Sequence, residues 1–333
     1  MFHDIVIFDV YIVIYIQITL VVMYRYKLTI EYNGYTYHGW QKQGCEEDYN
    51  LNEIDFNINN CNDKSISNAN KFNDNYRSKN NISNVNSKVK TIQYVLENAI
   101  FSLTGERVRL YAAGRTDAGV HAIGQVAHFD LSCFWLADKL ITGINYFLKH
   151  ENIVILSCEA VDLNFHARFS AVERAYKYKI DIRNSPCALN RHKVCWLRKG
   201  LDVKLLNKCL VKLKGSHDFQ AFKAVGCQAK SSIIDIRRLY MNLYLQDEDN
   251  IWHKQDLSDY NGDCLVNCRV EIVIVARSFL YKLIRNLVGA IINISQGFRD
   301  IKHIDIMLNT RDRQNNVFMT QVPYGLYFLY AKY

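Results

Sequence analysis

The sequence lacks any group of cysteines and histidines with the spacing of a zinc site. Ten cysteines are scattered over 333 residues. No Cys/His set completes a ligand group around the closest pair, Cys264 and Cys268. Disulfide frameworks belong to much shorter domains than this one. We therefore interpret the cysteines as reduced thiols, which indicates a cytoplasmic protein.

The chain has no strong excess of charge of either sign. Its formal net charge is +8, and its sequence pI is about 8.8. This moderate basic excess suits an anionic partner such as RNA, although many soluble proteins are equally basic. Because 49% of the residues are hydrophobic, a chain of this length can bury a full core, and we expect two domains.

Residues 1–22 lack the features of a signal peptide. No Lys or Arg precedes the apolar stretch at 5–23, and no small-residue cleavage site follows it. The stretch is just long enough for a membrane span, but it contains Asp9 and Gln17. The globular pattern begins directly after Met23. We expect Met23 to be the native start and residues 1–22 to be an extension, with a membrane anchor or an extra strand as alternatives.

Residues 44–88 contain no proline and few large apolar side chains, but 14 asparagines lie between Asn50 and Asn86. Such a tract cannot bury enough surface to offset the entropy of ordering it. We interpret it as a flexible insertion, with an RNA-contacting loop as the alternative.

The hydrophobic pattern of the remaining chain predicts two similar α+β halves. In the first half, strands are expected at 26–32, 107–113, 125–131 and 153–161, and helices at 90–103 and 136–148. In the second half, strands are expected at 172–182, 234–245 and 265–275, with an edge strand at 326–331. Helices are expected at 203–213, with Asp202 as its cap, and at 279–294. Each half has the order βαββαβ, which is the ferredoxin-like unit. Two such units can share one sheet with helices on one side, which would leave a cleft between the halves.

The most informative stretch is Gly-Arg-Thr-Asp-Ala-Gly-Val-His-Ala at residues 114–122. Its glycines permit a sharp turn and the close approach of another molecule. A carboxylate held there, at Asp117, can be a nucleophile or a general base. The adjacent Arg115 can favour the charged carboxylate and can bind phosphate. Because Asp and Gly are also ordinary turn residues, the spacing alone leaves a structural turn open.

The whole nine-residue string resembles the signature of the tRNA pseudouridine synthase A (TruA) family. Other blocks resemble further motifs of this family in the same order, and together they cover most of residues 24–333. They are Glu-Tyr-Asn-Gly at 31–34, Tyr-His-Gly-Trp-Gln-Lys-Gln at 37–43, Asn-Phe-His-Ala-Arg-Phe-Ser-Ala at 164–171, Arg-Ala-Tyr-Lys-Tyr at 174–178, the segment 276–286 and Pro-Tyr-Gly-Leu at 323–326.

The resemblance implies two ferredoxin-like halves that share a mixed, mainly antiparallel sheet with a central active-site cleft. The N-terminal catalytic-loop domain would be residues 23–163, and the C-terminal domain residues 164–333. The implied enzyme is an isomerase that converts uridine to pseudouridine at positions 38–40 of the tRNA anticodon stem-loop. It would be a cytoplasmic homodimer with a basic surface for tRNA and no membrane partner. The reaction exchanges no electrons and moves no phosphate, so we expect neither a redox cofactor nor a metal.

The resemblance also assigns roles to individual residues. Asp117 corresponds to the catalytic nucleophile, and Arg285 to the arginine that pairs with it. Tyr176 corresponds to the tyrosine that packs on the target base, and Arg115 to the arginine that helps to displace this base. Without the family motifs, Arg285 would be read as a helix-surface arginine and Tyr176 as an ordinary strand aromatic.

We expect further substrate contacts from Thr116 in the loop and from His166 and Arg168 at the domain junction, where phosphate can be bound. His121 and His128 are expected to be structural or phosphate-facing rather than acid–base groups. Lys282 stands where histidine is frequent in the family. This difference puts a special role for position 282 in doubt.

Three other functions stay open at this point. A catalytically silent RNA-binding relative is possible because paired ferredoxin-like units often serve only to bind, although Asp117, Arg115, Tyr176 and Arg285 are all intact. An aspartate-nucleophile hydrolase would need a metal-binding carboxylate cluster near Asp117, and the sequence shows none. A synthase that acts on another RNA is the third alternative, because a fold and a catalytic core do not fix the substrate.

Overall fold

The computed structural model describes residues 22–41, 90–249, 251–260, 262, 264–312, 316 and 318–333. The Asn-rich tract and all but the last residue of the apolar extension lie outside these residues, so the expectations for both stay predictions. Within the described ranges, no helix is long and apolar enough to cross a membrane.

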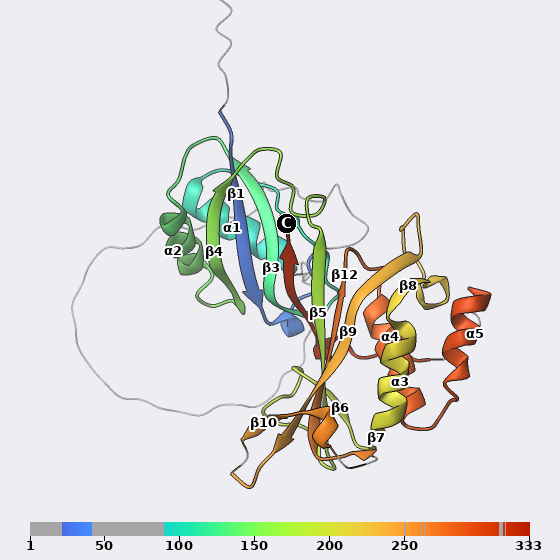
Figure 1. Cartoon of the computed structure of the whole chain (residues 1–333). Coiled ribbons are helices and arrows are strands. Elements are labelled where there is room, and N and C mark those ends of the chain that lie inside the picture. The colour runs from blue at the N-terminus through green and yellow to red at the C-terminus, as the bar shows by residue number, and fades with distance from the viewer. Residues whose placement is uncertain are drawn as a thin grey trace, which may run out of the picture.

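Among the residues that the structure describes, eleven strands form one mixed, mostly antiparallel sheet (Figure 1). They are β1 (Tyr24–Tyr32), β2 (Tyr111–Ala112), β3 (His121–Leu131), β4 (Ile153–Val161), β5 (Glu173–Ile182), β6 (Cys195–Leu197), β8 (Gly215–Asp218), β9 (Ile233–Gln246), β10 (Trp252–Gln255), β12 (Cys268–Ala276) and β13 (Leu326–Lys332). Eight lie side by side in the order β10-β9-β12-β5-β13-β3-β1-β4, while β2 pairs with β3, β6 with β5 and β8 with β9. The predicted α+β class is confirmed.

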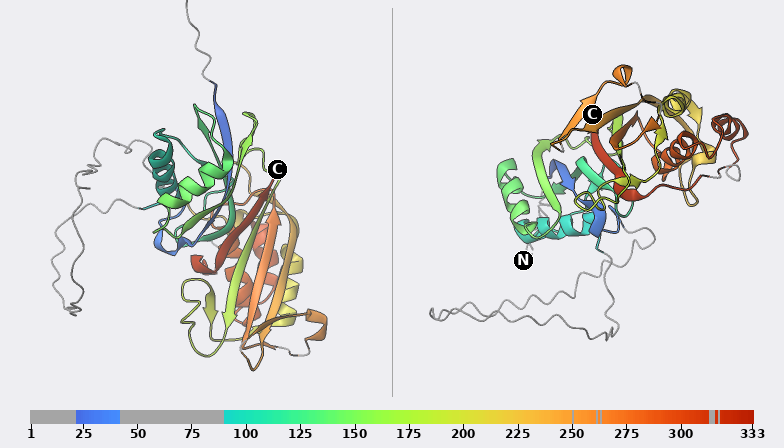
Figure 2. Two further views of the ribbon diagram at one scale, coloured as in Figure 1. Left: turned by 90° about the vertical axis from the view of Figure 1, so that its left-hand side faces the viewer. Right: turned by 90° about the horizontal axis from the view of Figure 1, so that it is seen from below.

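Within the described ranges, five α-helices form two groups on this sheet (Figures 1 and 2). Helices α1 (Ile92–Thr104) and α2 (Ala137–Phe147) lie against the part that contains β1, β3 and β4. Helix α3 (Val203–Leu213) contacts β9, α4 (Leu283–Ser295) packs against α3, and α5 (Lys302–Thr310) packs on the outer side against α3 and the short 3-10 turn at Gln220–Phe222. The buried faces of both groups belong to a single hydrophobic core, which also includes Leu28 of β1, Phe328 of β13 and Ile272 of β12.

Local capping explains where the predicted helices begin and end. Thr91 Oγ1 accepts a 3.3 Å hydrogen bond from Tyr94 N at the start of α1, and Gly105 ends this helix with a φ of 75°. The predicted cap of α3 is confirmed, because Asp202 Oδ1 accepts a 2.7 Å hydrogen bond from Leu205 N.

Several strand and helix predictions were wrong in position. The expected edge strand at 326–331 is internal, because β13 pairs antiparallel with β5 and parallel with β3. Of the strand expected at 107–113, only Tyr111–Ala112 (β2) is in a strand. The strand expected at 265–275 is broken at Asn267, whose φ of 48° separates β12 from β11 (Cys264–Leu265), and β11 pairs with β7 (Leu201–Asp202). Helix α4 begins four residues later than predicted, because Lys282 has a left-handed φ of 58°.

Candidate active site

The catalytic-loop candidate joins β2 to β3 and is held by backbone hydrogen bonds at several points. Trp40 N donates to Thr116 O over 3.0 Å, and Val120 N donates to Asp117 O over 3.1 Å. The preceding residue, Ala113, donates its N–H to Val126 O over 2.7 Å. These hydrogen bonds therefore fix the backbone around Asp117, and the loop is not a free surface turn.

Gly39 allows another segment to press against this loop. Its φ is +89°, and a Cβ atom at this position would lie 2.7 Å from Thr116 O and 3.0 Å from the carbonyl carbon of Asp117. Only glycine combines this backbone conformation with so close an approach. The described part of the block that resembles a family motif, residues 37–41, thus supports the loop from one side.

Thr116 is buried, and its side chain stabilises the catalytic loop through a hydrogen bond. Its Oγ1 shares a 2.7 Å hydrogen bond with the hydroxyl of Tyr32, and Gln125 Nε2 donates to Gly114 O over 2.8 Å. Burial raises the pKa of Tyr32 to about 12, so this hydroxyl stays protonated at neutral pH. The structure gives Thr116 a supporting position, and its contact with substrate stays a prediction.

Asp117 and Arg285 are in direct contact, as the sequence predicts. Arg285 Nη1 lies 2.8 Å from Asp117 Oδ2, and the two side chains are only 13% and 20% exposed. Arg285 stands in the first turn of α4, 168 residues away from Asp117 along the chain. The contact therefore joins the N-terminal loop to the C-terminal half of the molecule.

Gln321, which lies just before the closing motif at 323–326, holds Arg285 in place through hydrogen bonds. Arg285 Nε donates to Gln321 O over 2.7 Å, and Gln321 N donates to Arg285 O over 3.2 Å. The hydroxyl of Tyr178 donates to Val322 O over 2.7 Å. Because Gln321 O holds Arg285 Nε, the guanidinium presents Nη1 to the Asp117 carboxylate in a fixed orientation.

Tyr176 lies on β5 with its hydroxyl end against the catalytic loop. A Cβ atom at Gly114 would lie 3.3 Å from Tyr176 Oη. The ring makes edge-to-face contacts with Phe279 and Phe328, with centroid distances of 5.1 and 5.0 Å. Burial raises the pKa of Tyr176 well above its usual range, and the charge of Asp117 adds to this effect. The predicted tyrosine is thus brought to the loop in its neutral form.

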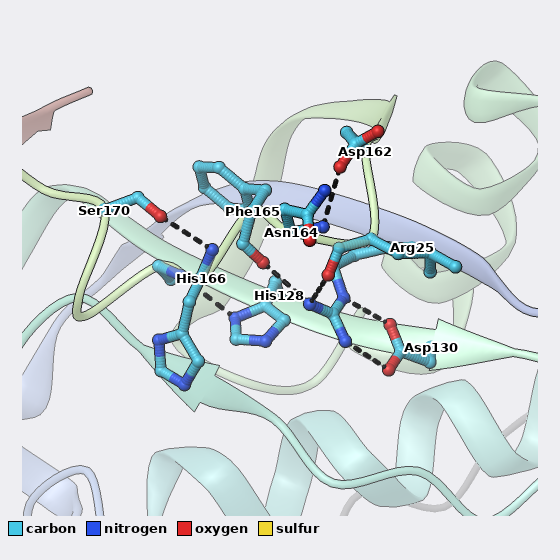
Figure 3. Close-up of polar contacts among 10 residues, drawn as sticks. Arg25, His128, Asp130, Asp162, Asn164, Phe165, His166 and Ser170 are labelled. Carbon is cyan, nitrogen blue, oxygen red and sulfur yellow. Dashed lines mark hydrogen bonds and ion pairs between the residues drawn. The ribbon is translucent and has the colours of Figure 1, made fainter.

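The other predicted contact residues lie at the surface or just beneath it. Arg115 and Arg168 are exposed. His166 is half-buried, and its Nδ1 accepts hydrogen bonds from the backbone N–H groups of Arg168 and Phe169 over 3.1 and 3.3 Å. Figure 3 shows His166 beside His128, with its backbone N–H bonded to Ser170 Oγ. Substrate contact by these residues stays a prediction.

His121 and His128 are buried and hold the backbone together. The Nδ1 atom of His121 accepts from Gly34 N over 3.1 Å, and that of His128 accepts from Ala167 N over 3.2 Å. Burial lowers the pKa of each to about 4, so both rings are neutral at physiological pH. Across the described ranges, no group of three or more His, Cys, Asp or Glu side chains is placed to hold a metal ion.

Sequence reasoning missed Arg174, which connects three parts of the site. This buried arginine donates from Nε to Ala113 O, from Nη1 to Arg277 O and from Nη2 to Arg168 O. It thereby joins the start of the catalytic loop, the domain junction and the segment before α4. The available signal was its place in β5: a charged residue two positions before Tyr176, facing the same side of a largely buried strand.

Comparisons with known proteins identify the family to which the chain belongs. A family model described as tRNA pseudouridine synthase matches residues 75–170 and 210–333. A tRNA pseudouridine synthase A from Ehrlichia canis (strain Jake) is 35% identical over 309 residues, which cover 93% of this chain and 100% of that protein. The protein of the same name from Ehrlichia chaffeensis (strain ATCC CRL-10679 / Arkansas) has the same identity and coverage. The chain belongs to the tRNA pseudouridine synthase A family of isomerases.

Proposed function

We propose that the chain isomerises uridine to pseudouridine at positions 38–40 of the tRNA anticodon stem-loop, with Asp117 as the nucleophile. The observation that carries the proposal is the Asp117–Arg285 contact of 2.8 Å at the end of a braced loop. The carboxylate is held by a guanidinium and is only partly solvated, which suits attack on a sugar or a base.

The reaction conserves atoms and electrons. The N1–C1′ bond of the uridine breaks, the uracil rotates, and a C5–C1′ bond forms. The C5 position loses its proton and N1 carries one in the product, so no oxidant, reductant or phosphate acceptor takes part. Asp117 attacks either C1′ of the ribose, in which case C5 displaces it as the new bond forms, or C6 of the base, in which case it leaves by elimination as C5 loses its proton after the new bond has formed.

The target uridine has to leave its stack before it can reach Asp117. Extruding a stacked base costs a few kcal/mol, and we assign part of this work to the exposed Arg115, which adjoins Thr116 and Asp117. Tyr176 is proposed as the surface on which the extruded uracil packs, because its hydroxyl end already lies against Gly114. Its neutral hydroxyl and apolar neighbours suit a flat, uncharged base.

We also infer two ferredoxin-like halves, at residues 23–163 and 164–333, with the active-site cleft between them. Two observations support this inference. The strand orders β2-β3-β1-β4 and β9-β12-β5-β13 repeat one pattern, in which the first strand of the half lies between the third and the fourth. The halves meet where β13 pairs with β3, close in sequence to the catalytic loop. A cytoplasmic homodimer is proposed from the family resemblance.

The test uses the purified chain and an unmodified tRNA transcript with uridines at 38, 39 and 40. Pseudouridine should form at these positions and nowhere else, and transcripts with a single remaining uridine should each be modified. The matched control carries cytidine at all three positions. Modification elsewhere in the tRNA would indicate a different substrate. Tight binding without turnover would favour a silent RNA-binding relative, and inhibition by a chelator would favour a metal-dependent hydrolase.

A further inference from the structure

The surface on one flank of the catalytic loop carries exposed aromatic rings and arginines. We name it the Tyr111–Phe169 platform, and it consists of Arg109, Tyr111, His166, Arg168 and Phe169. Tyr111 is 43% exposed and Phe169 is 72% exposed. The Arg109 guanidinium lies 5.7 Å from the centroid of the Tyr111 ring, and that of Arg168 lies 5.5 Å from the centroid of the Phe169 ring. Each of the two exposed rings, Tyr111 and Phe169, thus lies beside one arginine guanidinium.

Two histidines connect these rings into one packed set. Tyr111 lies nearly parallel to His128, with centroids 5.1 Å apart and an interplanar angle of 22°. The His128 and His166 centroids are 4.6 Å apart, and those of His166 and Phe169 are 4.4 Å apart. The rings of Tyr111 and Phe169 are therefore the solvent-facing ends of a continuous aromatic cluster, which a bound ring can extend.

The turn that carries Phe169 is rigid in spite of its exposure. The Nδ1 atom of His166 accepts from two consecutive backbone N–H groups, while the His166 N–H donates to Ser170 Oγ (Figure 3). Burial and the nearby Arg25 lower the pKa of His166, which keeps Nδ1 free to accept. Because the backbone that carries Phe169 is already held in place, binding to this ring loses little backbone entropy.

The platform has a fixed position relative to the catalytic loop. Arg174 donates to Ala113 O, directly before the loop, and to Arg168 O within the platform. This side chain is itself buried, so the two regions share one rigid connection. Among the nearby acids, Asp130 is paired with Arg25, whose Nε and Nη2 donate to Oδ1 and Oδ2 over 2.7 and 2.8 Å. The charge of Asp130 is compensated in this pair and does not oppose an anion at the surface, while Glu97 is half-buried and accepts from Leu110 N over 2.9 Å.

We propose that the Tyr111–Phe169 platform stacks unpaired nucleotides of the RNA next to the target uridine, while Arg109 and Arg168 bind their phosphates. The substrate class rests on the proposed function. Aromatic faces that alternate with arginines are the chemistry by which proteins hold single-stranded RNA, because every base offers a π-face and every nucleotide a phosphate. The loop nucleotides of an anticodon stem-loop meet this description, and the paired stem does not.

The experiment measures the affinity of the full chain for an anticodon stem-loop RNA at several salt concentrations. Phe169→Ala and Tyr111→Ala should each weaken binding roughly 5- to 150-fold, which is the loss expected for one stacked base, without changing the salt dependence. Arg168→Gln should weaken binding and also lower the slope of log affinity against log salt by about 1. Phe169→Tyr keeps the ring and should bind like the unchanged protein.

Phe298→Ala is the matched control. Phe298 is 59% exposed, and the Lys199 ammonium lies 4.3 Å from its ring centroid, but it follows α4 and is not part of the platform. This variant should bind RNA normally. Unfolding curves for all variants separate a loss of binding from a loss of fold.

Unchanged affinity of folded Phe169→Ala and Tyr111→Ala would overturn the platform, as would an equal loss in Phe298→Ala. A change of oligomeric state in Phe169→Ala, measured by light scattering, would also overturn it and would instead assign the ring to an interface between copies. Failure of the proposed function gives a different result. In that case the unchanged protein forms no pseudouridine at positions 38–40, whatever the affinities of the platform variants.

Discussion

Replacing Arg285 tests whether the orientation of the ion pair matters as well as its charge. The guanidinium donates in two directions, from Nη1 to Asp117 and from Nε to Gln321 O. Arg285→Lys keeps the positive charge but cannot make both bonds in these directions. Arg285→Met keeps much of the length and removes the charge altogether.

The expected losses follow from burial and geometry. Breaking a fully buried ion pair costs about 3–5 kcal/mol, whereas an exposed pair is worth about 0–1 kcal/mol. With side chains 13% and 20% exposed, the Asp117–Arg285 pair lies nearer the buried limit, and we take about 2–3 kcal/mol. Since each 1.36 kcal/mol is a factor of ten, Arg285→Met should lower kcat/KM roughly 30- to 150-fold. Arg285→Lys loses one hydrogen bond, about 1 kcal/mol, and should cost about fivefold.

The assay is tritium release from C5-labelled uracil in tRNA, combined with a binding measurement on the same RNA. Affinity should change little, because phosphate contacts elsewhere supply most of it. Arg299, exposed beyond the end of α4, provides the matched controls Arg299→Lys and Arg299→Met, which should react normally. If Arg285→Met retained a rate within threefold of the unchanged protein, the assigned role of Arg285 would be refuted.

Three further predictions concern the support of the site and its substrate. Gly39→Ala should destabilise the fold by about 1–3 kcal/mol and displace Thr116, with loss of turnover. Gly105→Ala, also at positive φ but with no atom within 4 Å, should show strain without loss of turnover, and equal activity of the two variants would contradict this reading. Because burial lowers the pKa of His121 and His128 to about 4, the folded state binds fewer protons than the unfolded state below pH 6.5. Urea unfolding should show full stability above that pH and a loss of up to about 1.4 kcal/mol per pH unit for each histidine between pH 6.5 and 4, and a flat profile would exclude this effect. Binding of tRNA should weaken steeply with salt, and a nearly constant affinity between low and moderate salt would argue against a phosphate-binding surface.

Local features of the fold could be predicted from the sequence because their causes lie within a few residues. The period of the apolar positions and the Asp202 cap define α3 as Val203–Leu213, as predicted. The place of β13 in the sheet could not be predicted in this way. Whether a strand is internal depends on pairing with residues far away in sequence, here on β3 and β5.

The contacts of the candidate site also differ in how far the sequence could predict them. The contact between Asp117 and Arg285 follows from motifs that resemble those of a family, and no spacing rule would connect residues so far apart. Arg174 was missed because its partners are the carbonyl groups of Ala113, Arg168 and Arg277. Every residue has such a carbonyl, so the sequence does not identify these partners, although the place of Arg174 in a largely buried strand indicates that its charge needs some.

The most direct test of the account is the variant Asp117→Asn, assayed for tritium release in a single turnover with excess enzyme and for tRNA binding. Asparagine keeps the shape of the side chain but removes its charge and nearly all its nucleophilicity. We expect no detectable tritium release from the variant and an affinity for tRNA close to that of the unchanged protein. Release of tritium by Asp117→Asn at a rate near that of the unchanged protein would contradict this expectation.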